Sequence, residues 1–187
     1  MHRLFPTVAL LVACVVATPV AADAAPAKAS PTAAAKPSSL PNGASAISEQ
    51  YADWTVSCTM TDAGKQCLFS QALVDKQTGQ RAVSLELHPT AGGDIQAVLL
   101  TPFSLRLDTG IKLAIDAKPA RGPFPFLSCV DAGCLVPLTL RGDLLADIKS
   151  GTTLAISATG LDQQPVALAL SLKGFGAAAM RTAVLAK

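Results

Sequence analysis

Short stretches in which apolar and polar residues alternate occur throughout the chain after about Tyr51. Residues 83–88 and 111–116 each place an apolar side chain at every second position. Because successive side chains of a strand point to opposite faces, each stretch predicts a strand with one buried and one hydrated face. Turn residues separate the stretches at intervals of about ten residues, which predicts an all-β sandwich or barrel. Further strands are predicted at residues 95–100, 135–140, 154–157 and 166–170.

Two segments depart from this alternation and predict helices. Asp143 is placed to cap a short internal helix over residues 143–149, whose apolar residues share one face, and Gly151 follows as a stop signal. The sequence also allows a short C-terminal helix that begins after Ser171 or Gly174. Both helices are expected to be accessories to a β domain.

The N-terminus has the pattern of an export signal over residues 1–22. A positive start that includes Arg3 precedes an apolar run over residues 4–16, which is shorter than the roughly 20 residues that a membrane-spanning helix needs. Small residues just before the cut favour cleavage by signal peptidase after Ala22 or Ala24. We therefore expect a periplasmic, secreted or cell-envelope protein with no transmembrane helix in its mature chain.

Cys14 offers an alternative at the same place. It ends a short match to the lipobox pattern, Leu11-Val12-Ala13-Cys14, in which the cysteine is lipidated and anchors the mature protein. The apolar run continues beyond Cys14 and an ordinary cleavage site follows, so cleavage is the favoured interpretation. Residues 23–48, which are mostly Ala, Pro, Ser, Thr and Lys, predict a disordered tether, and residues 49–187 the folded domain.

The four remaining cysteines are an even number in a chain expected to enter an oxidising compartment, which predicts two disulfides. Three pairings are open, and the short spacings favour Cys58 with Cys67 and Cys129 with Cys134. Each pair brackets a turn that contains glycine. Zinc binding is the competing use of four cysteines, but neither pair has the two-residue gap of a zinc ribbon, so no metal site is expected.

Charge and catalytic residue types limit the function further. The formal net charge is +2 and no run of like charges occurs, which argues against nucleic acid as a partner. The mature chain has a single histidine, His88, and lacks the Gly-x-Ser-x-Gly motif of serine hydrolases. The acid pairs Asp108 with Asp116 and Asp143 with Asp147 fit turn and capping roles. We therefore expect no catalytic residue and no cofactor.

Trp54 is the only tryptophan, and on a strand it shares a face with Val56 and Cys58. That placement predicts an aromatic core anchor close to a disulfide. The proline-containing segment 122–126 is expected to pack at the core or at a sheet edge, where proline is tolerated.

The order and spacing of several motifs over residues 51–179 resemble the invasion-associated locus B family. The resemblance implies an exported protein with an immunoglobulin-like antiparallel β-sandwich and no catalytic residues, in a family named because some pathogen members assist entry into host cells. Ala52 departs from the family pattern, which often has glycine there. The motifs are Tyr51-Ala52-Asp53-Trp54, Cys58, Cys67, Thr101-Pro102-Phe103, Gly110 to Asp116, Pro125-Phe126, Cys129, Gly133-Cys134 and Ser171 to Phe175.

These observations favour a non-enzymatic envelope protein that binds another protein or an envelope component, with a host surface as one location for the partner. A general periplasmic structural or stress-protective factor is the alternative. An envelope hydrolase that uses Asp108, Asp116 or His88 is a third, less favoured hypothesis.

Overall fold

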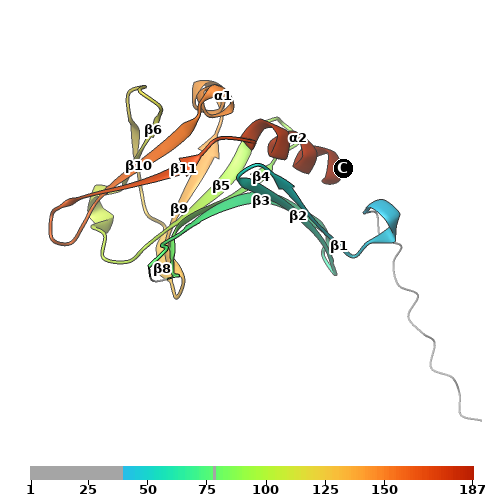
Figure 1. Ribbon diagram of the computed structural model, residues 1–187, viewed down its shortest axis with the longest axis horizontal. Helices are drawn as coiled ribbons and strands as arrows, with labels where there is room; N and C mark the ends of the chain where they lie inside the picture. Colours follow the sequence, from blue (N-terminus) through green and yellow to red (C-terminus); the bar gives the residue numbers. More distant parts are fainter. Residues whose placement is uncertain (1–39, 78) are drawn as a thin grey trace, which may run out of the picture. The chain divides into compact units, whose positions relative to one another are not determined.

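The computed structural model describes residues 40–77 and 79–187, and in them the strands form two antiparallel sheets (Figure 1). The all-β antiparallel sandwich predicted from the sequence is confirmed, and the predicted alternating stretches are β4, β6, β10 and β11. The seven-stranded sheet has the order β1 (Ala46–Tyr51), β2 (Trp54–Thr61), β3 (Gly64–Val74), β4 (Arg81–Pro89), β5 (Ile95–Thr101), β9 (Gly133–Leu140) and β8 (Ser128–Val130). The four-stranded sheet has the order β11 (Pro165–Ser171), β10 (Thr153–Thr159), β6 (Ile111–Ile115) and β7 (Arg121–Phe124).

Two α-helices occur in the described residues, α1 (Gly142–Ser150) and α2 (Phe175–Leu185), together with the short 3₁₀ turns η1 (Pro41–Gly43) and η2 (Leu107–Thr109). In Figure 1, α2 lies across the seven-stranded sheet near β2 to β4, and β10 and β11 lie beside it. One continuous apolar core contains residues of both sheets and both α-helices. The sandwich is thus completed on one side by α2 rather than by strands alone.

Trp54 lies at the centre of the contact between α2 and the seven-stranded sheet. Its side chain is fully buried, and its ring centroid lies 5.5 Å from that of Phe69 on β3 and 5.2 Å from that of Phe175 on α2. The indole Nε1–H donates to the carbonyl oxygen of Ser171 at 3.1 Å, so the polar atom of this buried ring is satisfied. The three rings join β2, β3 and the first turn of α2.

The folded domain begins earlier than the sequence predicted. The predicted tether over residues 23–48 includes the start of β1 at Ala46, and Leu40 is only 3% exposed and belongs to the core. Its boundary at residue 48 is therefore wrong, because single apolar residues in an Ala- and Ser-rich stretch give no visible alternation. The signal peptide predicted over residues 1–22, Cys14 and the first part of the tether lie outside the described residues.

The structure also corrects two details of the predicted helices. The N-cap of α1 is Arg141 and the helix begins at Gly142, so Asp143 lies in the first turn instead of capping it. In α2, Phe175, Ala178, Ala179, Thr182 and Leu185 are buried, which makes this helix part of the core rather than an accessory.

Candidate functional site

The predicted cysteine pairs are both bonded, Cys58 to Cys67 and Cys129 to Cys134. Each disulfide joins residues that lie directly opposite each other on neighbouring strands, β2 with β3 and β8 with β9. Both therefore strengthen hairpins within the seven-stranded sheet, and neither links the two sheets. Cys58 is buried, whereas Cys129 is exposed.

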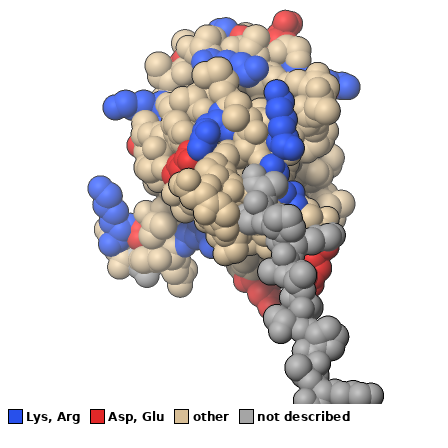
Figure 2. Space-filling view, turned by 90° about the vertical axis from the view of Figure 1, so that its right-hand side faces the viewer, with Lys and Arg blue, Asp and Glu red and all other residues tan. Residues whose placement is uncertain are grey.

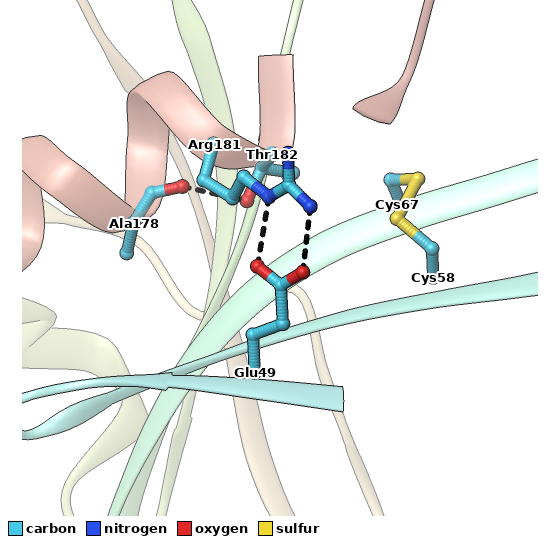
Figure 3. Close-up of a disulfide and its surroundings, with 6 residues drawn as sticks. All are labelled: Glu49, Cys58, Cys67, Ala178, Arg181 and Thr182. Atoms are coloured by element: carbon cyan, nitrogen blue, oxygen red, sulfur yellow. Dashed lines mark hydrogen bonds and ion pairs between the residues drawn. A yellow bond between two sulfur atoms is a disulfide. The ribbon is translucent and has the colours of Figure 1, made fainter. Parts of the chain in front are cut away.

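An ion pair fastens α2 to the edge of the seven-stranded sheet next to the first disulfide (Figure 3). The Arg181 guanidinium donates from Nε and Nη2 to the two carboxylate oxygens of Glu49 at 2.8 and 2.7 Å. The Tyr51 hydroxyl donates to the same carboxylate at 2.9 Å. Arg181 lowers the pKa of Glu49, and the Glu49 carboxylate raises the pKa of Tyr51.

The first pair of acids considered from the sequence, Asp108 and Asp116, already has structural partners. Asp108 is paired with Arg106, whose Nη2 lies 2.6 Å from Oδ2, and this hydrogen bond lowers the pKa of Asp108. Asp116 accepts the hydroxyl of Thr152 at 2.6 Å and backbone N–H groups of Thr152 and Thr153, which lowers its pKa as well. Both carboxylates are therefore ionised near neutral pH and are poor proton donors.

The second pair lies on α1. Asp147 bridges Lys118 and Arg121 at 2.5 Å each, and Lys118 is the larger cause of its lowered pKa. These contacts tie α1 to the start of β7 and to the segment before it. Asp143 is in the first helical turn, and His88 is half-buried on β4. Within the described residues, no three His, Cys, Asp or Glu side chains lie together as metal ligands would.

Basic residues are spread singly over the face shown in Figure 2, which includes acidic and many uncharged side chains. Such a surface lacks the continuous basic stripe that phosphate backbones need. In the part of the chain that the structure describes, no helix is long and apolar enough to cross a bilayer.

The β5–β6 loop and the β10–β11 turn lie at the end of the sandwich opposite α2 (Figure 1), and together they carry three exposed large apolar side chains. Phe103 is 52% exposed, Leu107 46% and Leu161 68%, and we call these three residues the loop-end surface. They belong to the β5–β6 loop and the β10–β11 turn. Phe103 and Leu161 line the same hollow, and Leu107 follows Phe103 on the β5–β6 loop. Exposed apolar groups that lie together mark contact surfaces more often than scattered ones do.

Backbone hydrogen bonds hold the two loops of the loop-end surface together. The N–H of Leu161 donates to the carbonyl of Ser104 at 2.9 Å, and the N–H of Arg106 donates to Thr159 at 2.8 Å. Between these bonds, Leu105 forms a β-bridge with Gly160 and is buried. The buried Leu105 anchors the loop from which Phe103 and Leu107 project.

Hollows of about 400 and 530 Å³ lie on the two sides of Phe103. The first is lined by Leu161 and Val166, and the second by Arg81, Asp131 and neighbouring turn residues. Both volumes are in the range of about 300–1,000 Å³ typical of ligand sites. Apolar side chains next to polar rims suit recognition of another molecule's surface.

A further groove of about 340 Å³ runs between α2 and the β4–β5 turn. Ala179, Met180 and Ala183 of α2 line it, together with Pro89, Ile95 and Lys149. Small side chains dominate this groove, so it offers fewer anchoring groups than the loop-end surface. We take the loop-end surface as the candidate functional site.

Two hairpin disulfides and an antiparallel sandwich completed by α2 define a class, that of small disulfide-bonded β-sandwich proteins. The family model for the invasion associated locus B (IalB) protein matches residues 54–183. The chain belongs to the invasion-associated locus B family.

Relatives and a solved structure agree with this assignment. The chain is 44% identical over 151 residues to an invasion protein B homolog of Brucella abortus (strain 2308). The aligned segment covers 80% of this chain and 86% of the relative. It is 31% identical over 129 residues to invasion protein B of Bartonella bacilliformis, which covers 68% and 69% of the two chains. The crystal structure of invasion associated protein B from Bartonella henselae is similar at a TM-score of 0.69 and 25% identity, covering 75% of this chain and 97% of the other.

Sequence reasoning did not identify the loop-end surface or the Glu49–Arg181 pair. Phe103 and Leu161 are each a single large apolar residue among turn residues, as in Pro102-Phe103-Ser104 and Gly160-Leu161-Asp162. The sequence gives no clear signal for this surface, because single apolar residues in loops are common and their exposure depends on the tertiary structure.

Proposed function

We propose that this protein is exported and acts as a non-enzymatic interaction module of the cell envelope, with the loop-end surface contacting a partner protein. The proposal rests on the exposure of Phe103, Leu107 and Leu161. Backbone hydrogen bonds join the two loops that carry these residues, and the buried Leu105 attaches one loop to the core. A preorganised apolar surface binds with little loss of conformational freedom.

The energetic scale fits such a role. Full burial of a Leu or Phe side chain contributes roughly 1.5–3 kcal/mol, and a few aromatic anchors commonly dominate an interface. Phe103 has the features of an anchor, since it lies between two hollows that a partner's side chains can fill. Leu107 and Leu161 extend the apolar area around it.

The state of the polar residues supports the non-enzymatic part of the proposal. Asp108, Asp116 and Asp147 are engaged by basic or hydroxyl partners that lower their pKa values. Active sites generally shift pKa values toward the working pH instead. The names of the relatives extend the proposal to invasion, with the partner protein on a host surface.

Crosslinking in intact cells followed by mass spectrometry tests the partner. The double variant F103S/L161S is expected to lose most of the crosslinked partner that the wild-type protein captures. The control M180S/V184S removes two exposed apolar residues from α2 and should retain capture. Thermal melting verifies that both variants fold. Equal capture by the wild type and F103S/L161S would contradict the proposal.

Cell fractionation with the intact mass of the mature protein tests export. The proposal predicts an envelope or secreted fraction, a mass that corresponds to cleavage after Ala22 or Ala24, and two disulfides. A lipidated N-terminus at Cys14 would place the cleavage before Cys14 and anchor the mature protein, and export would still hold. Recovery of the uncleaved chain from the cytoplasm would contradict export.

A further inference from the structure

The groove between α2 and the β4–β5 turn is longer than its first hollow. That hollow of about 340 Å³ adjoins a second one of about 420 Å³, which lies toward the end of α2. Along the helix the two extend from Gly176 to Ala186, a rise of about 15 Å at roughly 1.5 Å per residue. Both hollows share four lining residues and so form one groove, which we call the α2 groove: Pro89, Thr90, Gly93 and Ala183.

The surface of the α2 groove is mainly apolar. Ala179 of α2 is 7% exposed and Ile95 of β5 is 3% exposed, so both lie at its base. Met180, which also lines the first hollow, is 69% exposed and can close over a ligand. Gly176 and Ala183 leave the helix open to close approach because their side chains are absent or small. A narrow alkyl chain gains close contacts in such a channel.

The polar groups of the β4–β5 turn are already used within the turn. The Thr90 N–H and hydroxyl both donate to the carbonyl of Asp94, at 2.9 and 3.0 Å, and the N–H of Gly93 donates to the carbonyl of Thr90 at 3.1 Å. On the other side of the groove, the backbone of α2 is hydrogen-bonded within the helix. A bound peptide would therefore leave the backbone groups that face the groove without partners, whereas an alkyl chain has no such groups.

The charged residues that line the α2 groove, within the described part of the chain, are both lysines. Lys149, at the end of α1, lines the first hollow and Lys187 lines the second, whereas the Asp94 carboxylate of the turn lines neither. Lys149 is exposed and belongs to none of the ion pairs of the described residues. A ligand of complementary charge is therefore an anion. Gly176 lies in the first turn of α2, where the helix dipole favours an anion at the same end.

We propose that the α2 groove binds a long-chain fatty acid, with the carboxylate at Lys149 and the alkyl chain along Ala179 and Ala183 toward Ala186. A single carboxylate matches the single ammonium group at that end, and a single chain matches a channel bounded by one helix and one turn. The proposal does not rest on the loop-end surface, which lies at the opposite end of the molecule (Figure 1).

Isothermal titration calorimetry of the purified mature protein with dodecanoate, below its micellar concentration, tests the ligand class. One site per chain is expected, with an affinity that falls by up to about fourfold for each methylene removed, as in decanoate and octanoate. Dodecanol, which has the chain without the charge, should bind roughly threefold to fivefold more weakly. Absence of dodecanoate binding, or equal binding of dodecanol, would overturn the proposal. Binding to phosphatidylglycerol vesicles alone would assign the groove to a two-chain lipid and also overturn it.

Substitutions in matched pairs test the place of binding. A183F fills the part of the groove that both hollows share and should weaken dodecanoate binding roughly tenfold or more, whereas A177F, on an exposed part of α2 outside the groove, should not. K149E should weaken binding at least as much as loss of the ligand's charge does, whereas K112E, at an exposed lysine of β6, should not. Thermal melting verifies that each variant folds. Equal affinities of K149E and K112E, or of folded A183F and A177F, would overturn the proposal.

NMR spectra of protein labelled at its alanine methyl groups locate the ligand directly. Dodecanoate is expected to shift the signals of Ala179, Ala183 and Ala186, which line the groove, and to leave that of Ala132 unchanged. Ala132 lines the hollow beside Phe103 and therefore reports on the loop-end surface. Shifts at Ala132 without shifts at the three groove alanines would place the fatty acid elsewhere and refute the assignment.

Discussion

Ser171 and Gly174 explain at the level of single residues how the C-terminal helix reaches the core. The Ser171 carbonyl accepts the indole of Trp54, and Gly174 precedes α2 with φ +92°, where the left-handed backbone favours glycine. A Cβ at Gly174 would also collide with the backbone of Tyr51. The motif Ser171 to Phe175 noted in the sequence therefore has a structural role, since it brings Phe175 onto Trp54.

Replacement of Phe175 by alanine is expected to lower the free energy of unfolding by roughly 3–5 kcal/mol, the usual cost of emptying a buried aromatic site. Phe175 is 1% exposed and contacts both Trp54 and Phe69. Urea unfolding monitored by tryptophan fluorescence measures the change. Phe103→Ala, the same substitution at an exposed site, should change the stability by less than about 0.5 kcal/mol.

Ala52 stands where the family often has glycine, and its φ of 52° gives the reason for that preference. A left-handed backbone costs a non-glycine residue roughly 1–2 kcal/mol, while glycine increases the entropy of the unfolded chain by somewhat less. Ala52→Gly is therefore expected to raise the melting temperature slightly, by a gain of at most about 1 kcal/mol. A clear decrease would contradict the strain argument.

Asp147 makes the stability of the protein depend on pH in the acidic range. Lys118 and Arg121 lower its pKa from 3.8, so the folded state holds its proton less tightly than the unfolded state does. Its contribution to stability is therefore complete above about pH 4 and is lost as the pH falls through the folded-state pKa. Denaturation curves at several pH values should show that the free energy of unfolding of D147N falls less steeply with decreasing pH than that of the wild type.

At the level of elements, regular alternation and short cysteine spacings were sufficient to predict most strands, both disulfides and α1. The role of α2 could not be predicted, because its buried face consists largely of Ala178, Ala179 and Thr182, which carry a weak hydrophobic signal. Its position depends on Trp54 and Phe69, which are far away in the sequence. The exposure of Phe103 likewise depends on tertiary structure.

The two disulfides should differ in their response to reduction. Cys129 is exposed and the Cys129–Cys134 bond closes the turn between two edge-side strands, whereas both Cys58 and Cys67 are buried. Access governs attack by a thiol reagent. Alkylation after brief mild reduction, analysed by peptide mass, is expected to label Cys129 and Cys134 first. Earlier labelling of Cys58 and Cys67 would contradict the assigned burial.

At the level of the whole domain, the contacts that hold α2 on the core and the proposed contact surface are separate. In Figure 1, α2 and the strands β1 to β3 that it contacts lie at one end of the molecule, and the β5–β6 loop and the β10–β11 turn, which carry the loop-end surface, lie at the opposite end. Substitutions on the exposed loops should therefore affect binding more than folding. This separation makes the proposed function testable without loss of the native structure.

A photoreactive amino acid placed at single positions in intact cells tests the central claim most directly. Positions 103 and 161 of the loop-end surface are expected to form crosslinks to a partner protein, while position 184, equally exposed on α2, should not. Crosslinks from position 184 alone, or from none of the three positions in correctly folded protein, would contradict the assignment of the loop-end surface as the binding site.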